Sequence, residues 1–379
     1  MLQAIINGQV FDGESLRAGQ AVLIEGGRIV AVVDQDQMPT GIDAVYDLEG
    51  GTLTPGFIDL QVNGGGGVLF TSEPTVASLR TIASAHRQTG TTGFLPTLIT
   101  SDFDVMRQAI CAVRQAMTEG VPGVLGIHLE GPFLNPQRRG VHDAGKFCAL
   151  EEAGFDVVTA FDEGVTLVTL APELTSTSMI RRLVQQGVIV SCGHSVASYE
   201  QTIAAFEAGA TGCTHLYNAM TPLQSREPGM VGASLVHEHS WFGIIADGFH
   251  MHPAAFRIAV SAKKTGGAIL VTDAMPTVGS PHKSFVLDGE TIIASEGRVT
   301  NAAGTLAGSD LDMWSAVSNA AEFAGLDWFE ALRMATVYPA RALGLQAELG
   351  AIRAGYRASL LALDSQHQIR ASWVDGIRA

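Results

Sequence analysis

The chain has 379 residues, of which 46% are hydrophobic, 16% charged and 7% aromatic. This balance excludes a disordered, low-complexity or collagen-like chain and predicts a large buried core. The 38 acidic residues outnumber the 23 lysines and arginines by 15, and no basic cluster is present, so we do not expect nucleic-acid binding. The length fits one large domain with a smaller one.

No signal peptide is recognisable at the N-terminus, and no apolar run reaches the ~18 residues of a membrane span. We therefore expect a cytoplasmic protein that does not contact a membrane. The cysteines contain no CxxC pair and are too sparse for a disulfide framework, so we expect them to be reduced. They are Cys111, Cys148, Cys192 and Cys213.

Both ends of the chain predict short alternating strands separated by Gly, Asp and Asn turns. These strands are Ala4–Val10, Ala21–Glu25, Arg28–Val33, Ala44–Leu48, Ser359–Leu363 and Gln368–Val374. We expect one small β-sandwich domain, built from residues 1–53 and 345–379.

Between the two ends, apolar β-rich runs alternate with helix-like stretches, which is typical of parallel βα units. The predicted strands are Gly56–Gln61, Thr92–Thr97, Val124–Glu130, Val165–Leu170, Val188–His194, Gly212–His215, Trp241–Ala246 and Ala268–Asp273. The predicted helices are Val76–Gln88, Phe103–Met117, Glu151–Phe161, Ser178–Gln186, Tyr199–Ala208, Ala254–Lys264, Ser309–Phe323 and Phe329–Tyr338. Eight parallel strands predict an α/β fold, a (β/α)8 TIM barrel over residues 54–344.

A doubly wound open sheet is the alternative architecture, and it would carry a glycine-rich phosphate loop after its first strand. Gly64–Gly67 lies at that place but lacks the GxGxxG spacing, and no GxxxxGK[ST] motif occurs. We interpret the glycine run as a flexible loop over the site.

Four predicted strands end in a side chain that can bind metal or transfer protons: Glu130, His194, His215 and Asp273. The carboxyl ends of barrel strands converge on the face that carries active sites, so these side chains should meet. One carboxylate and two imidazoles leave a coordination position open, as catalytic zinc sites do. We predict a divalent metal on Glu130, His194 and His215, with Asp273 as the proton shuttle.

Nearby polar residues have simpler interpretations. Cys192 and Cys213 each lie two residues before a predicted histidine ligand and share its strand face; they could be thiolate ligands, but small apolar core residues are favoured. His128 stands in the same relation to Glu130 and is interpreted as a core or supporting residue. No GxSxG motif occurs, so a Ser-His-Asp mechanism is unsupported.

Two further groups of residues lie in loops. His237, His239, His250 and His252 form a local cluster that fits either a solvated loop or a site. Arg226 follows the sixth strand and is one of few basic residues on the predicted active face, which makes it a candidate anion anchor.

Six motifs, in this order, together resemble a known family. They are HLEGPF at 128–133, CGHS at 192–195, THLYNAM at 214–220, DGFH at 247–250, VTDAM at 271–275 and TLAGS at 305–309. The chain resembles the N-acetylglucosamine-6-phosphate deacetylases of the amidohydrolase superfamily over its whole length.

This resemblance implies that Glu130, His194 and His215 bind the metal and that Asp273 is the catalytic acid/base. These are the roles already predicted from the positions of these residues at strand ends. It further implies that His142 polarises the acetamide carbonyl as a catalytic residue. It assigns the sugar phosphate to a set of side chains and backbone groups, namely His142, Asn218, Ala219, Arg226, His250 and Leu306. Arg226 and His250 would reach the substrate of the neighbouring subunit, so a homodimer is expected.

One position departs from many relatives in the superfamily, which carry His-x-His after the first strand and bind two metals. Here the same place reads Gln61-Val-Asn63, and amides are poor ligands for a transition metal. We therefore expect one ion per subunit, with zinc preferred and iron, cobalt and manganese as alternatives.

The resemblance implies metal-dependent hydrolysis of N-acetyl-D-glucosamine 6-phosphate to D-glucosamine 6-phosphate and acetate, in amino-sugar catabolism and cell-wall sugar recycling. The alternative is another amidohydrolase acting on N-acyl amino acids or cyclic amides, but such enzymes usually need the missing His-x-His. A catalytically silent scaffold would be expected to have lost a ligand or Asp273, and none is lost.

Overall fold

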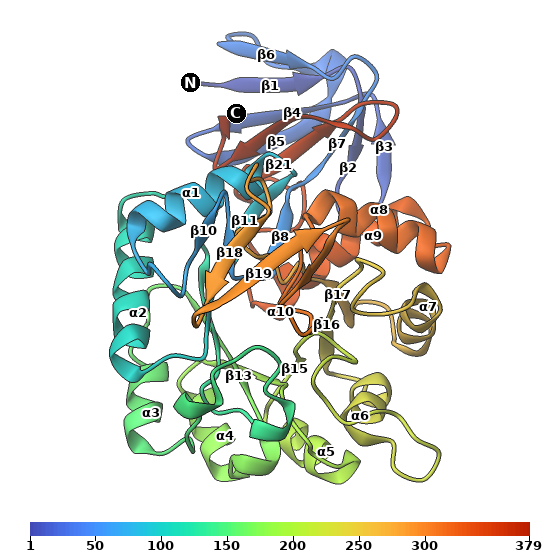
Figure 1. Cartoon of the computed structure of the whole chain (residues 1–379). Helices are drawn as coiled ribbons and strands as arrows, with labels where there is room; N and C mark the ends of the chain where they lie inside the picture. Colours follow the sequence, from blue (N-terminus) through green and yellow to red (C-terminus); the bar gives the residue numbers. More distant parts are fainter.

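The computed structural model describes all 379 residues, and its centre is a barrel of parallel strands surrounded by helices (Figure 1). The barrel strands neighbour one another in chain order. They are β8 (Phe57–Val62), β11 (Thr91–Ile99), β12 (Gly126–Glu130), β13 (Val165–Leu170), β14 (Ile189–Cys192), β15 (Gly212–Cys213), β16 (Trp241–Ile244) and β17 (Ala268–Leu270). A parallel bridge between Val62 and Ala274 closes the circle, so the predicted TIM barrel is confirmed.

Ten α-helices follow the chain. They are α1 (Val76–Arg87), α2 (Phe103–Thr118), α3 (Glu152–Val158), α4 (Thr177–Gln185), α5 (Tyr199–Glu207), α6 (Gly229–Val236), α7 (Pro253–Ala262), α8 (Met313–Ala324), α9 (Trp328–Ala335) and α10 (Val337–Ala342). Local signals start several of them: the side chain of Thr75 caps α1, and Ser198 with Gln201 forms a capping box at α5. Their apolar faces pack onto the barrel in one core cluster of 74 buried residues.

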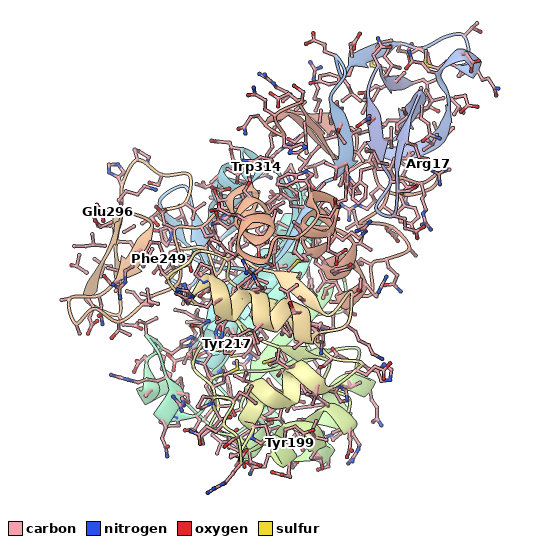
Figure 2. All side chains as sticks on the ribbon, turned by 90° about the vertical axis from the view of Figure 1, so that its right-hand side faces the viewer. Arg17, Tyr199, Tyr217, Phe249, Glu296 and Trp314 are labelled. Carbon is pink, nitrogen blue, oxygen red and sulfur yellow. The ribbon has the colours of Figure 1, made fainter.

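A smaller β unit lies at one end of the barrel and combines both ends of the chain (Figure 1). One of its sheets contains β1 (Gln3–Ile6), β4 (Gln20–Glu25), β5 (Arg28–Asp34) and β6 (Ala44–Asp47). The other contains β2 (Gln9–Phe11), β3 (Leu16–Ala18), β7 (Thr52–Pro55), β21 (Leu360–Leu363), β22 (Ile369–Val374) and β23 (Ile377–Arg378). Figure 2 labels Arg17 in this unit and Tyr199 at the opposite end of the molecule. The exact domain boundaries, 53/54 and 344/345, stay a prediction.

Several short strands, one sheet and one helix were not predicted. A three-stranded antiparallel sheet, β18 (Ser284–Leu287), β19 (Glu290–Ser295) and β20 (Arg298–Thr300), stands beside the barrel mouth, where Figure 2 labels Glu296. Helix α6 also escaped prediction because Gly229 and Gly232 are poor helix formers; its residues from Gly229 to Leu235 are buried.

Some predicted elements are divided in the structure. The expected strand Ala4–Val10 is β1 and β2, separated where Asn7 takes a φ of 59°. The expected helix Phe329–Tyr338 is α9 and the start of α10, separated by Thr336 with φ −130° and ψ −74°. The small β9 (Gly64–Gly65) and β10 (Val68–Leu69) pair with each other beside the first barrel strand. None of the helices combines the length and hydrophobicity that crossing a membrane requires.

Candidate metal centre

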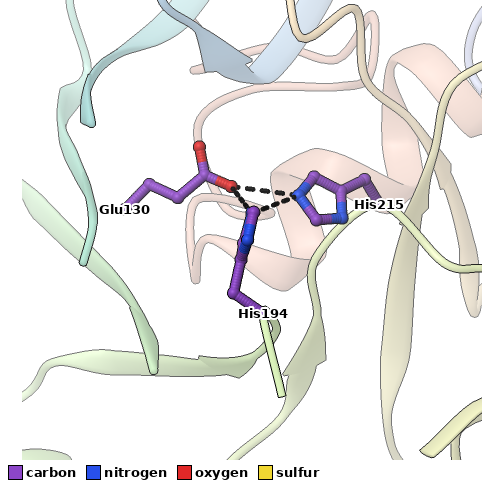
Figure 3. Close-up of side chains that lie close together, drawn as sticks. All are labelled: Glu130, His194 and His215. Atoms are coloured by element: carbon purple, nitrogen blue, oxygen red, sulfur yellow. Dashed lines mark hydrogen bonds and ion pairs between the residues drawn. The ribbon is translucent and has the colours of Figure 1, made fainter. Parts of the chain in front are cut away.

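Three strand ends bring a carboxylate and two imidazoles together at one face of the barrel (Figure 3). Glu130 is the last residue of β12, while His194 and His215 each follow their strand by two residues. Nε2 of His215 lies 3.1 Å and Nε2 of His194 3.4 Å from Oε1 of Glu130, and the two Nε2 atoms are 3.1 Å apart. All three side chains are buried, and each directs one ligand atom to a common point. The predicted convergence of these residues is therefore present.

The backbone turns sharply where these side chains leave the barrel. His194, His215 and Asp273 have φ values of 48°, 33° and 53°. Such left-handed conformations cost about 1–3 kcal/mol for residues other than glycine, and they cluster at functional sites. This turn ends β14, β15 and β17 earlier than predicted, because the residues at the site are no longer extended.

The hydrogen bond of His194 to the backbone defines its tautomer. Its Nδ1 lies 2.8 Å from the carbonyl oxygen of Arg138, which can only accept a hydrogen bond. The Nδ1 therefore carries the proton, and in the neutral ring Nε2 presents its lone pair to Glu130 and His215. This outer hydrogen bond is the arrangement that orients metal-binding histidines.

Electrostatics keep the carboxylate ionised. Burial alone would raise the pKa of Glu130, but the imidazoles of His194 and His215 that face its carboxylate hold that pKa well below the usual range. The three side chains thus provide one anionic oxygen and two nitrogen ligands in a buried setting, and this donor set suits a divalent transition metal.

Asp273 lies beside the triad and is held by two amides. Its Oδ1 accepts hydrogen bonds from Nδ2 of Asn63 at 2.7 Å and from Nε2 of Gln61 at 3.0 Å. Gln61 Nε2 is also 3.2 Å from both carboxylate oxygens of Glu130, so it links the two acids. Burial, and next the negative charge of Glu130, raise the pKa of Asp273. The residues at the His-x-His position therefore orient the carboxylates, a role that the sequence analysis missed.

His142 enters the site from the loop between two short 3-10 helices, Pro136–Arg138 and Ala144–Lys146. Its ring centroid is 4.5 Å from that of His194. The backbone N–H of Thr100 donates to Nδ1 of His142 at 3.4 Å, and the hydroxyl of Thr100 lies 2.9 Å from the same atom. Burial, followed by the charge of His194, lowers the pKa of His142 to about 3. The neutral ring then carries its proton on Nε2 and can donate it in a hydrogen bond.

A cavity of about 370 Å³ contains the triad, Asp273 and His142. Most of the remaining residues expected to hold the sugar phosphate line the same cavity, namely Asn218, Ala219, His250 and Leu306. His250 was expected to reach the substrate of the neighbouring subunit, but here it lines the cavity of its own chain. Arg226 does not; it is exposed in the loop that precedes α6 and lies outside the cavity of its own chain. The three-stranded sheet of β18, β19 and β20 contributes Arg298 to the cavity lining. The sequence analysis missed this residue, although Glu296-Gly297 just before it is a typical turn signal between strands.

The two cysteines and His128 have the core and supporting roles that the sequence analysis favoured. Burial raises the pKa of the Cys213 thiol to about 12 and that of Cys192 well above its ordinary value, so both behave as apolar core residues. His128 lies between the hydroxyls of Thr97 and Thr169, at 3.2 and 2.8 Å from its two nitrogens, and burial lowers its pKa to about 4.

The glycine run differs from expectation, and the structure divides the histidine cluster between the two alternatives left open for it. The glycines form the tight turn of β9 and β10, and Gly64 donates to the carbonyl of Ala274 at 3.0 Å, so this segment is tied to the barrel end instead of forming a free loop. Of the four clustered histidines only His250 lines the cavity, where Asp247 Oδ2 lies 2.6 Å from its Nδ1.

Comparison with known proteins agrees with this site. Residues 52–378 match the Amidohydrolase family, and residues 2–53 match the NagA composite domain. The chain is 45% identical to an N-acetylgalactosamine-6-phosphate deacetylase of Shewanella sp. strain ANA-3, over 87% of this chain and 84% of that protein. It is 37% identical to the N-acetylglucosamine-6-phosphate deacetylase of Haemophilus influenzae, over 99% of both chains.

Solved structures of similar fold are also hexosamine-phosphate deacetylases. The N-acetylglucosamine-6-phosphate deacetylase of Pasteurella multocida superposes with a TM-score of 0.96 at 34% identity, covering 100% of both chains. A variant of the Mycobacterium smegmatis enzyme, in complex with N-acetyl-D-glucosamine-6-phosphate, superposes with a TM-score of 0.90 at 32% identity, over 100% of this chain and 98% of that one. The chain belongs to the amidohydrolase family, within the group that contains these hexosamine-phosphate deacetylases.

Proposed function

We propose that the chain hydrolyses N-acetyl-D-glucosamine 6-phosphate to D-glucosamine 6-phosphate and acetate, as part of amino-sugar breakdown. The observation that carries this proposal is the cavity in which a Glu/His/His metal triad, an amide-held carboxylate and a neutral histidine donor converge. Each of these groups has a task in cleaving a linear amide. The relative in Haemophilus influenzae, which shares 37% identity over 99% of the chain, is named for this reaction.

The residues present fit a single divalent ion held by Glu130, His194 and His215. The three ligand atoms lie within 4.8 Å of one another, and the tautomer of His194 leaves its Nε2 free to bind. Such an ion supplies Lewis acidity: it polarises the acyl oxygen and makes water easier to deprotonate. Zinc suits this ligand set best, with iron, cobalt and manganese as alternatives. Gln61 and Asn63 donate their amide hydrogens to the carboxylates, which argues against a second ion there.

Asp273 acts as the general base and then as the general acid. Its Oδ1 is occupied by the amides of Asn63 and Gln61, while Oδ2 makes no hydrogen bond. Oδ2 therefore takes a proton from the attacking water and later delivers it to the departing amine. His142 donates its Nε2–H to the acyl oxygen, where negative charge develops as water adds. Asn218, Ala219, His250 and Leu306 line the rest of the cavity and hold the sugar phosphate.

Arg226 acts in a homodimer in this proposal. It is exposed, forms no ion pair, and lies outside the cavity of its own chain, beside Leu223, which is 52% exposed. A neighbouring subunit that covers this loop would bury Leu223 and place the guanidinium at the other subunit's phosphate. Sedimentation analysis should give a dimer, and Arg226→Gln should raise KM for the phosphorylated sugar far more than for the unphosphorylated one. A fully active monomer would contradict this arrangement.

N-Acetyl-D-galactosamine 6-phosphate is a second candidate substrate. The specific observation in its favour is the relative named for that deacetylation, which shares 45% identity with this chain. The two sugars differ only in the configuration at C4, remote from the amide that the site would cleave. The same catalytic groups therefore serve both substrates, and their relative kcat/KM decides between them.

Acetate release tests the proposal. Purified protein of known metal content is assayed with both phosphorylated sugars, with N-acetylglucosamine, and with an N-acyl amino acid and a cyclic amide as controls. We expect turnover that needs about one ion per chain and strongly prefers a phosphorylated sugar. Asp273→Asn should keep the ion and lose activity by orders of magnitude, because the amide cannot accept the proton. Failure of the metal-loaded protein to release acetate from either sugar phosphate would refute the function.

A further inference from the structure

Arg298 is the only lysine or arginine that lines the catalytic cavity. It begins β20, is exposed, and its side chain makes neither an ion pair nor a hydrogen bond within the chain. Because side chains alternate along a strand, Arg298 points away from the apolar cluster that buries its neighbour Val299. Its guanidinium is thus free to bind a ligand.

The three-stranded sheet holds this guanidinium at the cavity mouth. The carbonyl of Val299 accepts a hydrogen bond from Ala307 N at 3.1 Å, and Thr300 pairs with Leu306, so β20 is tied to the segment that forms one cavity wall. At the other side, a Cβ at Gly297 would lie 3.2 Å from the ring of Phe249. Figure 2 shows Phe249 and Glu296 on the same side of the molecule.

A dianionic ligand would be favoured by an additional positive charge at this place. The chain has a formal net charge of −15, and the acidic side chains that line the cavity are Glu130 and Asp273. A divalent ion held by Glu130 would offset this charge at the triad, and a phosphate monoester would still be attracted by a basic group at the cavity mouth. Arg226, the basic residue expected to provide that balance, lies outside the cavity of its own chain. Arginine also matches the geometry of phosphate oxygens with two parallel N–H donors.

We propose that Arg298 binds the phosphoryl group of the substrate from within the same chain and sets the preference for phosphorylated sugars. This inference rests on the proposed function, which it deepens by assigning the phosphate contact that each subunit supplies for itself. Phosphate selectivity then resides partly in an edge strand of the three-stranded sheet, which carries none of the residues for amide cleavage.

The test compares Arg298→Gln and Arg298→Lys with wild type in kcat/KM for N-acetylglucosamine 6-phosphate and for N-acetylglucosamine. Arg298→Gln should lower kcat/KM for the phosphorylated sugar about 10- to 100-fold, mainly through KM, as expected for lost charge-assisted hydrogen bonds. The value for the unphosphorylated sugar should change less than about twofold, since no contact to it is lost. Arg298→Lys should be intermediate, because it keeps the charge but loses the paired donors.

Arg181→Gln is the matched control. Arg181 lies on α4, is exposed, and forms no ion pair or side-chain hydrogen bond, so its loss removes one positive charge far from the cavity. The control should leave both kcat/KM values unchanged. Equal losses on both sugars in Arg298→Gln, or no loss on either, would overturn the proposal.

A binding measurement separates this inference from the proposed function. Calorimetry with inorganic phosphate is performed on metal-loaded wild type and Arg298→Gln, so that any phosphate contact to the ion is common to both. Weaker binding in the variant supports the anion site even if wild type releases no acetate. Equal binding, or no binding by wild type, overturns the assignment of Arg298 whatever the enzymatic activity.

Discussion

Replacing Asn63 by leucine should move the pH profile of the enzyme without unfolding it. The amide of Asn63 donates to Oδ1 of Asp273 at 2.7 Å, a bond to a charged group that is worth about 1.5–3 kcal/mol. Since one pKa unit corresponds to about 1.4 kcal/mol, losing this bond should raise the pKa of Asp273 by about one to two units. Gln61 still donates to the same oxygen, so the carboxylate keeps its orientation.

The assay is the pH dependence of kcat/KM for acetate release, whose acid limb reports the base of the free enzyme. In Asn63→Leu this limb should move to higher pH by about one to two units, because the base now needs a higher pH to ionise, while the plateau stays. Stability at neutral pH should fall by about the 1.5–3 kcal/mol of the lost bond, which is less than the free energy of unfolding of a typical domain, so the variant stays folded. An unmoved acid limb, in a variant with normal metal content, would refute the role given to the amide.

Three further predictions concern stability. Zinc at about 100 times its dissociation constant should stabilise the metal-free protein by about 2.7 kcal/mol, and a melting temperature that a chelator leaves unchanged would contradict the metal site. Trp373→Ala, which empties the core of the small β unit at a side chain only 1% exposed, should cost about 3–5 kcal/mol in denaturant unfolding; a loss below about 1 kcal/mol would show that the site collapses. Burial opposes ionisation of Asp247, but its hydrogen bond with His250 lowers its pKa, so the stabilisation is complete above the ordinary carboxyl pKa and disappears as the pH falls through the lowered value. The stability difference between wild type and Asp247→Asn should therefore shrink from pH 7 to pH 3, and a constant difference would exclude this linkage.

The barrel could be predicted because its strands are short, buried and mainly apolar runs, and because most of them are separated from the next by a helical pattern. The run Val165–Leu170 was predicted with the bounds of β13. The ligands could be predicted for a related reason, since Glu130, His194 and His215 interrupt apolar runs at the one end where barrel strands carry function.

The features that escaped prediction depend on contacts between distant segments. Strand β20 has three residues, and its position over the cavity comes from Leu306 and Phe249, which no local pattern connects to it. The roles of Gln61 and Asn63 were missed for the same reason. Both amides donate to Asp273, which is more than 200 residues away in the sequence, so their role can be recognised only in the folded structure.

The small β unit has a consequence for how the protein is made. Strand β7, near residue 55, pairs with β21, which begins at residue 360. At synthesis rates of about 5–20 residues per second, roughly 15–60 s pass between the emergence of these two strands. Throughout that interval the sheet of β2, β3 and β7 presents an unpaired edge. The edge of β7 can therefore be paired only after the last 20 residues of the nascent chain have been synthesised. Ribosome pausing or early truncation would leave this strand edge exposed and prone to aggregation.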